Sequence, residues 1–335
     1  MNVAFRTDSS SIIGSGHLMR CLTLAKQLKK QYNAEVFFIC RNLQGNLSHL
    51  VEDAGFRLVL LPKADKNVAL NGYEAWLTVP EMVDANETCT IIERFGKSVD
   101  RLVVDSYAIT AMWEKRLRPL TKEIFVIDDL ANRPHDCDIL LDQNEYLDKE
   151  TRYKGLVPDK CKLLLGYKHV LLRDEFYEAK KTMRRRDGRI RNILVFYGGS
   201  DPTNETMKAL KALSEIKLSG ITVNVIVGGS NAHKDEVAEF CKQYEGFNYF
   251  CQVNNMAEMM AKADLALGAG GTTTWERLFL ELPSIVTAIA DNQVQIAEDC
   301  DKAGLVTYIG TANEVKRKDI LIAVRYFIEG EANET

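Results

Sequence analysis

A glycine-rich turn followed by a histidine is the first feature of the sequence whose residue types and spacing suggest chemistry. Gly14 and Gly16 precede His17, at the junction between the apolar stretch NVAFR and a segment with helical periodicity at 16–32. Glycines let a ligand approach the backbone, and the free N–H groups at the start of a helix favour an anion. A neutral imidazole at this point can act as a general base. The alternative is a capped helix in which His17 only forms a hydrogen bond.

Two loops in the second half of the chain have the composition of phosphate-binding turns. The first contains Gly199, Ser200 and Asp201 and follows the apolar stretch NILVF. It lacks the GxGxxG fingerprint of dinucleotide-binding folds, but a Gly-Gly-Ser turn still offers backbone N–H groups to a phosphate. The alternative interpretation is an N-capped helix after a tight turn.

The second of these loops is GAGGTTTWE, in which glycines and hydroxyl side chains precede an expected helix. Its candidate phosphate contacts are Gly270, Gly271, Thr272 and Thr273. Glu276 stands in the first turn of that helix, where a carboxylate could accept hydrogen bonds from both ribose hydroxyls of a nucleotide. The alternative role for Glu276 is to complement the helix dipole.

Three further polar residues also follow strand-like stretches. Asn292 and Gln293 come after PSIVTA, and their amides suit sugar hydroxyls or acetamido groups, or else they cap a helix. Tyr107 comes after RLVVD, where it either faces a ligand or packs in the core with its hydroxyl satisfied. A metal site is not expected, because the segment HDCD at 135–138 has no second cluster of ligands with it.

The elements that must position these residues form two similar sets. Short apolar stretches, such as EVFFIC and RLVVD early and TVNVIVGG and PSIVTA late, alternate with segments of helical periodicity. This alternation predicts parallel sheets covered on both faces. We therefore predict an α/β protein with two doubly wound, Rossmann-like domains, 1–165 and 166–335, that face a central cleft. Because ligands bind at the carboxyl ends of parallel strands, the loops should hold a nucleotide diphosphate there.

Composition limits the class of protein. The 335 residues are 46% hydrophobic and 27% charged, as in ordinary globular proteins, and a net charge of −4 argues against a nucleic-acid partner. The eight cysteines show no CxxC spacing, which favours a reduced, cytoplasmic protein. No signal-peptide pattern and no apolar run of about 18 residues is present, so membrane insertion is not expected.

Longer segments of the chain resemble a known family. They are FRTDSSSIIGSGHLMRCLTLAKQL, WLTVPEMVDANET, VVDSYAI, IDDLANRPHDCDILLDQN, YKGLVPDKCKLLLGYKHVLLRDEFY, YGGSDPTNET and ADNQVQIAEDC. From Met1 to about Ala303, in matching order, they resemble the nucleotide-sugar hydrolases of the pseudaminic acid pathway. The resemblance is specific to this family because it combines three motifs: the GxGH loop, the DDxxxRxHDCD segment and the late Asn-Gln pair. The second half is more distantly similar to the N-acetylglucosaminyltransferase of peptidoglycan lipid-intermediate synthesis.

The resemblance implies hydrolysis of UDP-2,4-diacetamido-2,4,6-trideoxy-β-L-altropyranose to UDP and the free sugar, with the glycosyltransferase type B fold and neither metal nor cofactor. It implies His17 as the catalytic base, Tyr107 near the substrate, and Glu276 and Asn292 as nucleotide and sugar contacts. We expect sugar binding and catalysis in the first domain, UDP binding in the second, and inverting attack of water at C1. A monomer or weak dimer is expected, with a product used for flagellin glycosylation or a surface polysaccharide.

Three alternatives use the same fold, because a fold does not decide the chemistry performed on it. A glycosyltransferase would bind the same donor but exclude water and require an acceptor. A hydrolysing 2-epimerase would release an epimerised amino sugar and would use paired acidic residues. A non-catalytic module would bind the UDP-sugar without turnover.

Overall fold

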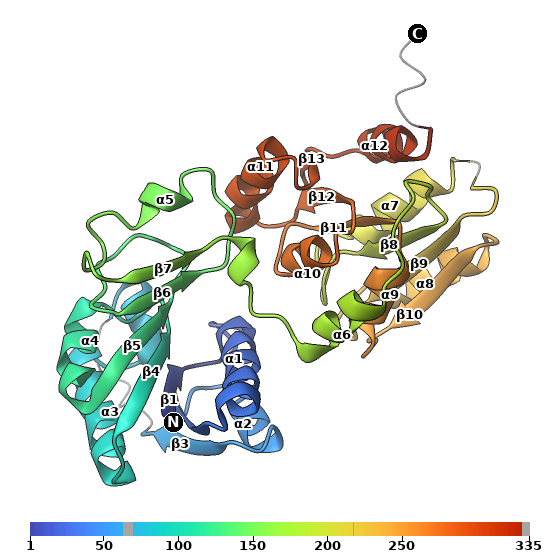
Figure 1. Ribbon diagram of the computed structural model, residues 1–335. Coiled ribbons are helices and arrows are strands. Elements are labelled where there is room, and N and C mark those ends of the chain that lie inside the picture. Colours follow the sequence, from blue (N-terminus) through green and yellow to red (C-terminus); the bar gives the residue numbers. More distant parts are fainter. Residues whose placement is uncertain (63–69, 217, 330–335) are drawn as a thin grey trace. The chain divides into compact units, whose positions relative to one another are not determined.

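The chain folds into two units. The computed structural model describes residues 1–62, 70–216 and 218–329. Unit 1 contains Met1–Asn144 and Asp148–Leu171, and unit 2 contains Glu145–Leu147 and the chain from Leu172 onward (Figure 1). Residues 330–335, the polar end of the chain, lie outside the described residues.

Unit 1 is built on one parallel sheet. Its strands are β1 (Asn2–Thr7), β2 (Glu35–Arg41), β3 (Arg57–Leu61), β4 (Val99–Asp105), β5 (Thr121–Ile127), β6 (Ile139–Asp142) and β7 (Lys162–Leu165). They pair in the order β3-β2-β1-β4-β5-β6-β7, every pair parallel. The parallel sheet predicted for this half is confirmed, and β7 adds an edge strand that the sequence pattern had not indicated.

Helices cover both faces of this sheet (Figure 1). They are α1 (Gly16–Tyr32), α2 (His49–Asp53), α3 (Glu81–Phe95), α4 (Ala111–Leu117) and α5 (Lys149–Arg152), with 3-10 turns η1 (Gly72–Leu77), η2 (Arg118–Leu120) and η3 (Tyr167–His169). Successive side chains of a strand point to opposite faces. Phe5 and Phe38 therefore pack in the cluster that includes α1 and α2, whereas Ala4 and Phe37 pack in the cluster that includes α3 and α4.

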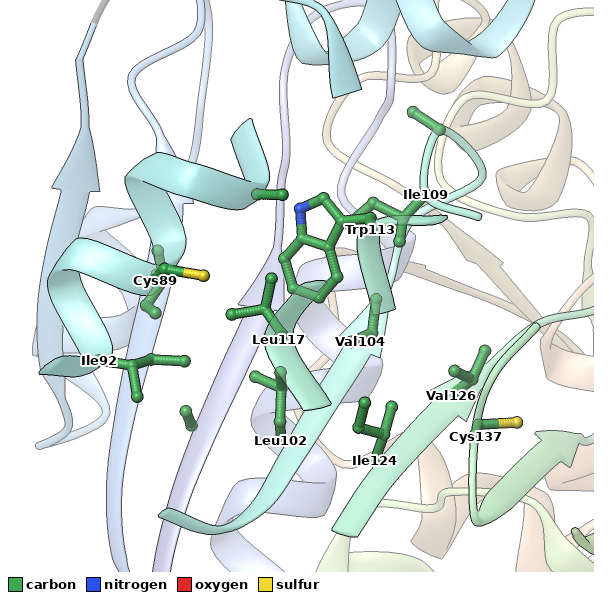
Figure 2. Packing of buried hydrophobic residues seen from close by; sticks show 14 of the residues in the cluster. Cys89, Ile92, Leu102, Val104, Ile109, Trp113, Leu117, Ile124, Val126 and Cys137 are labelled. Atoms are coloured by element: carbon green, nitrogen blue, oxygen red, sulfur yellow. The ribbon is translucent and has the colours of Figure 1, made fainter. Parts of the chain in front are cut away.

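The core beneath α3 and α4 holds the segment that connects β4 to α4. Figure 2 shows Trp113 of α4 close to Leu117 and to Val104 of β4, all fully buried or nearly so. The indole N–H of Trp113 donates to Asp84 Oδ1 at 3.0 Å, so the ring is fixed at its polar edge as well. At the start of α4, Thr110 Oγ1 accepts a hydrogen bond from the backbone N–H of Met112. The end of this segment at the start of α4 is thus held by the Thr110 cap and by the buried Trp113.

Unit 2 is built on a second parallel sheet. Its strands are β8 (Asn192–Phe196), β9 (Thr222–Val227), β10 (Phe247–Cys251), β11 (Leu265–Ala269), β12 (Ser284–Ala288) and β13 (Thr307–Thr311). They pair in the order β10-β9-β8-β11-β12-β13, again all parallel. Strands β11 and β12 are buried along their whole length, as expected for central strands covered on both faces.

The helices of unit 2 follow the predicted alternation. They are α6 (Asp174–Thr182), α7 (Glu205–Leu213), α8 (Lys234–Lys242), α9 (Met256–Lys262), α10 (Thr273–Phe279), α11 (Val294–Lys302) and α12 (Arg317–Glu329), with the 3-10 turn η4 (Asp291–Gln293). Helices α7, α8 and α12 share one hydrophobic cluster with the sheet. Among the residues that the structure describes, no helix is both long and apolar enough to span a bilayer.

Each sheet has one point where the strand order reverses. In unit 1 the chain proceeds outward from β1 to β3 and then returns to place β4 on the other side of β1. In unit 2 the same reversal lies between β8 and β11. Loops that leave two neighbouring strands in opposite directions leave room for a ligand at the carboxyl edge. A ligand is therefore expected at these two points.

Candidate active site

His17 lies at the reversal point of unit 1, at the start of α1. The loop before it is tight, because the carbonyl of Ser10 accepts from Gly14 N at 2.9 Å and Ser10 Oγ accepts from Ile13 N at 3.0 Å. Gly14 has a φ of 79°, which a side chain would strain, so the glycine is needed for this turn. Gly16 begins α1, and His17 follows it with 7% of its surface exposed. The loop thus holds the imidazole at the edge of the sheet.

Asp105 orients the imidazole ring. It ends β4, directly opposite Thr7 of β1 in the sheet register, and is fully buried. Its Oδ1 lies 2.6 Å from Nδ1 of His17. Burial opposes ionisation of Asp105, but the charges of Arg20 and His17 outweigh it and hold the pKa of the carboxyl well below its usual range. A carboxylate only accepts, so Nδ1 carries the proton and the lone pair of a neutral ring lies on Nε2.

Arg20 fixes the carboxylate that orients His17. It lies one helical turn after His17 on α1, and it donates from Nε to Asp105 Oδ2 at 2.6 Å and from Nη2 to Oδ1 at 2.7 Å. Because two parallel hydrogen bonds join the guanidinium to the carboxylate, the Asp105 carboxylate can neither shift nor rotate freely. Nη1 of Arg20 also donates to Asp129 Oδ2 at 3.0 Å, which links this pair to the loop after β5.

Tyr107 contacts the same group of residues. Its O–H donates to Asp129 Oδ1 at 2.5 Å, and its ring packs edge-on against the His17 ring at 4.6 Å between centroids. Burial, and then the charge of Asp129, raises the pKa of Tyr107 well above its ordinary value. The phenol is therefore a neutral donor, and of these two side chains only the neutral imidazole offers a lone pair that can accept a proton.

Two more aromatic residues complete this corner of unit 1. Tyr73 and Trp76 of η1 pack around Tyr107, at 5.2 Å and 5.5 Å between ring centroids, and Trp76 also lies 6.0 Å from His17. Tyr73 is exposed and Trp76 is half-buried. We call Tyr73, Trp76 and Tyr107 the aromatic wall. It gives an apolar, partly accessible surface beside the imidazole.

Sequence reasoning selected His17 and Tyr107 but missed the residues that hold them. Asp105, Arg20 and Asp129 come from three different parts of the chain. A signal existed for the first two: Asp105 ends a buried strand, and Arg20 is spaced three residues from His17 on one helix. Tyr73 and Trp76, the other two members of the aromatic wall, had no comparable signal.

In unit 2, the loop after β8 has its predicted residues in different roles. Gly199 and Ser200 are exposed, whereas Asp201 is buried and accepts from the backbone N–H groups of Glu205 and Thr206, both at 2.9 Å. Both oxygens of Asp201 therefore hold the start of α7. A side chain at Gly228 would place its Cβ 2.1 Å from the carbonyl oxygen of Gly199, so the next loop supports this one closely.

The loop after β11 meets the turn after β12. Gly270 and Gly271 lie against the side chain of Gln293, where added Cβ atoms would be 3.3 Å from its Cβ and 3.5 Å from its Nε2 respectively. Oε1 of Gln293 accepts from Ile289 N at 3.1 Å, which keeps this amide in place. Asn292 and Thr272 are exposed and Thr273 is half-buried, at the same edge of the sheet. These predicted residues are thus brought together.

Glu276 lies in the first turn of α10. Arg173 Nη2 donates to its Oε1 at 3.2 Å. Burial raises the pKa of Glu276 above its ordinary value, although the charge of Arg173 acts against this shift. Within the described ranges, no group of three or more His, Cys, Asp and Glu side chains is arranged to hold a metal ion.

Both units are Rossmann-like, and a chain of two such units has the glycosyltransferase type B fold. The crystal structure of MurG from Acinetobacter baumannii has this fold: it matches with a TM-score of 0.64 at 12% identity, over 98% of this chain and 90% of that chain. The predicted fold class is confirmed.

Sequence comparisons show which known proteins this chain is similar to. Residues 192–316 match the glycosyltransferase family 28 C-terminal domain. The chain is 28% identical to the UDP-2,4-diacetamido-2,4,6-trideoxy-beta-L-altropyranose hydrolase of Campylobacter jejuni, over 91% of this chain and 97% of that protein. It is 27% identical to an uncharacterized protein of Methanocaldococcus jannaschii over 99% of its own length, and spans 62% of that protein. The resemblance noted in the sequence is confirmed: the chain is a relative of this hydrolase.

Proposed function

We propose that the protein hydrolyses UDP-2,4-diacetamido-2,4,6-trideoxy-β-L-altropyranose to UDP and the free diacetamido sugar. The observation that carries the proposal is the His17–Asp105 pair, which lies at the reversal point of the sheet in unit 1. Such a pair is the arrangement that makes a histidine a general base. The relationship to the Campylobacter hydrolase supports the substrate.

In this reaction, Nε2 of His17 takes a proton from a water molecule as the water oxygen attacks C1 of the sugar. The C1–O bond to the diphosphate breaks, its electron pair leaves with UDP, and the configuration at C1 inverts. Asp105 stabilises the imidazolium that forms. One base suffices, unlike in retaining glycosidases, which use two close carboxylates. The terminal phosphate of UDP has a second pKa of about 6, so the leaving group needs no general acid.

The aromatic wall supports a sugar as the group that reacts next to His17. A trideoxy sugar with two acetamido groups presents methyl groups and C–H faces, which pack well on aromatic rings. Tyr73 and Trp76 offer such a surface, and Tyr107 joins it to the imidazole. We assign the sugar to this surface.

We assign UDP to unit 2, where the family 28 match lies. The proposed phosphate contacts are the two loops that the sequence selected, Gly199–Ser200 and Gly270–Thr273. Glu276 is proposed to bind the ribose hydroxyls, and Asn292 with Gln293 to bind an acetamido group or sugar hydroxyls. Asp201 supports its loop through α7 and is proposed to act only in that way.

The test is hydrolysis of this UDP-sugar in ¹⁸O-labelled water with EDTA present, for the wild type and for His17→Asn. His49→Asn is the matched control, because His49 is an exposed histidine of the same unit. We expect label in the free sugar and none in UDP. We expect turnover of His17→Asn to fall about 10²–10⁴-fold and that of His49→Asn to stay unchanged.

Other outcomes would contradict the proposal in specific ways. Label in the phosphate product would mean attack at phosphorus. Loss of turnover with EDTA would mean that a metal takes part. UDP-sugar binding without release of sugar would favour a transferase or a binding module, and an epimerised amino sugar would favour a 2-epimerase.

A further inference from the structure

Arg277 is a buried cation in unit 2 that forms no ion pair among the described residues. It follows Glu276 in α10 and only 2% of its surface is exposed. Within the described part of the chain, no acidic side chain lies within salt-bridge distance of it, although Glu276 and Tyr197 act on it from further away. Burial lowers the pKa of Arg277 to about 10, so the guanidinium still carries its charge at neutral pH.

The hydrogen bonds of Arg277 do not replace a counter-charge. Nη2 donates to the carbonyl of Ala269 at 2.9 Å and to Thr274 Oγ1 at 3.0 Å. Nη1 lies 3.5 Å from Thr273 Oγ1, at the limit of a hydrogen bond, and Nε has no partner. All of these acceptors are neutral. A buried charge without an ionic partner is unfavourable unless something else provides the opposite charge.

The guanidinium lies beside the ends of β8 and β11, where the two candidate phosphate loops begin. Phe196 of β8 and Gly268 of β11 are register partners. A Cβ added to Gly268 would lie 2.5 Å from Nη1 of Arg277 and 2.6 Å from the carbonyl oxygen of Phe196. Glycine at this position therefore makes room for the guanidinium at the reversal point of the sheet.

We propose that Arg277 supplies the positive charge that attracts the diphosphate of the nucleotide to unit 2. The inference rests on the proposed function and deepens it, since the phosphates would provide the counter-charge that the protein lacks. Arg277 is buried and donates to Ala269 and Thr274, so it acts as a positioning residue: its field reaches the ligand, and its hydrogen bond holds Thr274.

A purely structural role for Arg277 would lead to different results. If Arg277 served only to tie Ala269 to α10, its removal would lower the melting temperature of the ligand-free protein. If it is a buried charge without an ion-pair partner, a neutral replacement should leave that melting temperature unchanged or raise it. The same replacement should weaken the binding of anionic ligands only. Stability and ligand selectivity therefore separate the two roles.

The experiment uses the full chain with Arg277→Gln and Arg277→Lys, and with Arg186→Gln as the matched control. Arg186 also donates to backbone carbonyls of unit 2, those of Ala263, Leu280 and Met260. Calorimetry measures the dissociation constants of UDP and uridine, and a thermal scan without ligand measures the melting temperature. We expect Arg277→Gln to weaken the binding of UDP about 10–100-fold and to leave the affinity for uridine unchanged. We expect its melting temperature to be no lower than that of Arg186→Gln. Arg277→Lys should recover most of the affinity for UDP.

Four results would overturn the inference alone. Three concern Arg277→Gln: unchanged UDP affinity, equal loss of affinity for UDP and for uridine, or a melting temperature well below that of Arg186→Gln. The fourth is an equal loss of affinity for UDP in Arg277→Gln and Arg277→Lys, because lysine keeps the positive charge. A wild type that binds no UDP would remove both the inference and the assignment of UDP to unit 2.

Discussion

Replacing Asp105 by asparagine tests the tautomer on which the proposed role of His17 as general base depends. Oδ1 of Asp105 faces His17 Nδ1 and Arg20 Nη2, and Oδ2 faces Arg20 Nε at 2.6 Å. Asparagine offers one acceptor and one NH₂ group. With its oxygen toward Nδ1, its NH₂ opposes the Nε–H of Arg20, and with its oxygen toward Nε it opposes the Nη2–H, so either orientation weakens the pair with Arg20. In the second orientation the NH₂ also faces Nδ1, which must then be the acceptor. The ring proton moves to Nε2, and the base is lost.

The expected loss of rate in Asp105→Asn follows from what a general base contributes to catalysis. A positioned general base contributes about 10²–10⁴-fold to a rate, or about 3–5 kcal/mol. We expect Asp105→Asn to lower kcat by that factor and to leave UDP affinity unchanged, since UDP is assigned to unit 2. Combining it with His17→Asn should add little, because the two residues act together.

The assay is release of free sugar from the UDP-sugar under saturating conditions, together with UDP affinity and melting temperature. Asp100→Asn is the matched control, because Asp100 is on the same strand and its side chain is partly exposed. The reasoning is refuted if Asp105→Asn turns over within about twofold of the wild type, or if the losses in the double variant multiply.

Three further predictions concern the surroundings of this pair. Because burial and Asp129 hold the pKa of Tyr107 above its ordinary value, the phenol stays protonated to at least about pH 9; pH–rate profiles of Tyr107→Phe and wild type should therefore share one alkaline limb. Trp76→Ala should raise KM about 3–10-fold and Trp76→Phe less, as kinetics at fixed pH would show. Burial opposes ionisation of Asp84, but Arg6 and Arg41 lower its pKa to about 2. Its stabilising contribution is thus present above about pH 4 and is lost as pH falls toward 2. Denaturant unfolding of Asp84→Asn should show a loss of about 3–5 kcal/mol at pH 7 and a smaller change on acidification than wild type.

Local patterns predicted the fold well where elements are long or fully buried. The helical periodicity at 16–32 gave both ends of α1 correctly, because a glycine turn precedes it and an apolar stripe runs along it. Strand β7, in contrast, is short and only half-buried at the edge of its sheet, so its sequence carries little of the signal of a buried strand.

The predicted site residues divide in a similar way. His17 could be found from its sequence neighbours, since glycines and a helix start are adjacent in the chain. Asp201 could equally be read as a ligand contact or a helix cap, and the structure shows that its oxygens hold α7. Whether a polar side chain faces a ligand or its own backbone depends on a rotation that spacing does not encode.

The sequence by itself determined the alternation of strands and helices, the two parallel sheets and the loop that carries His17, because these follow from periodicity and local turn chemistry. Only the tertiary structure decided that Asp105, 88 residues away, would orient the imidazole, since that contact depends on the pairing of β4 with β1. It also decided that Arg277 would be buried at the ends of β8 and β11, with no ion-pair partner among the described residues. Burial and long-range pairing depend on how the sheet is assembled, and no local stretch of sequence contains that information.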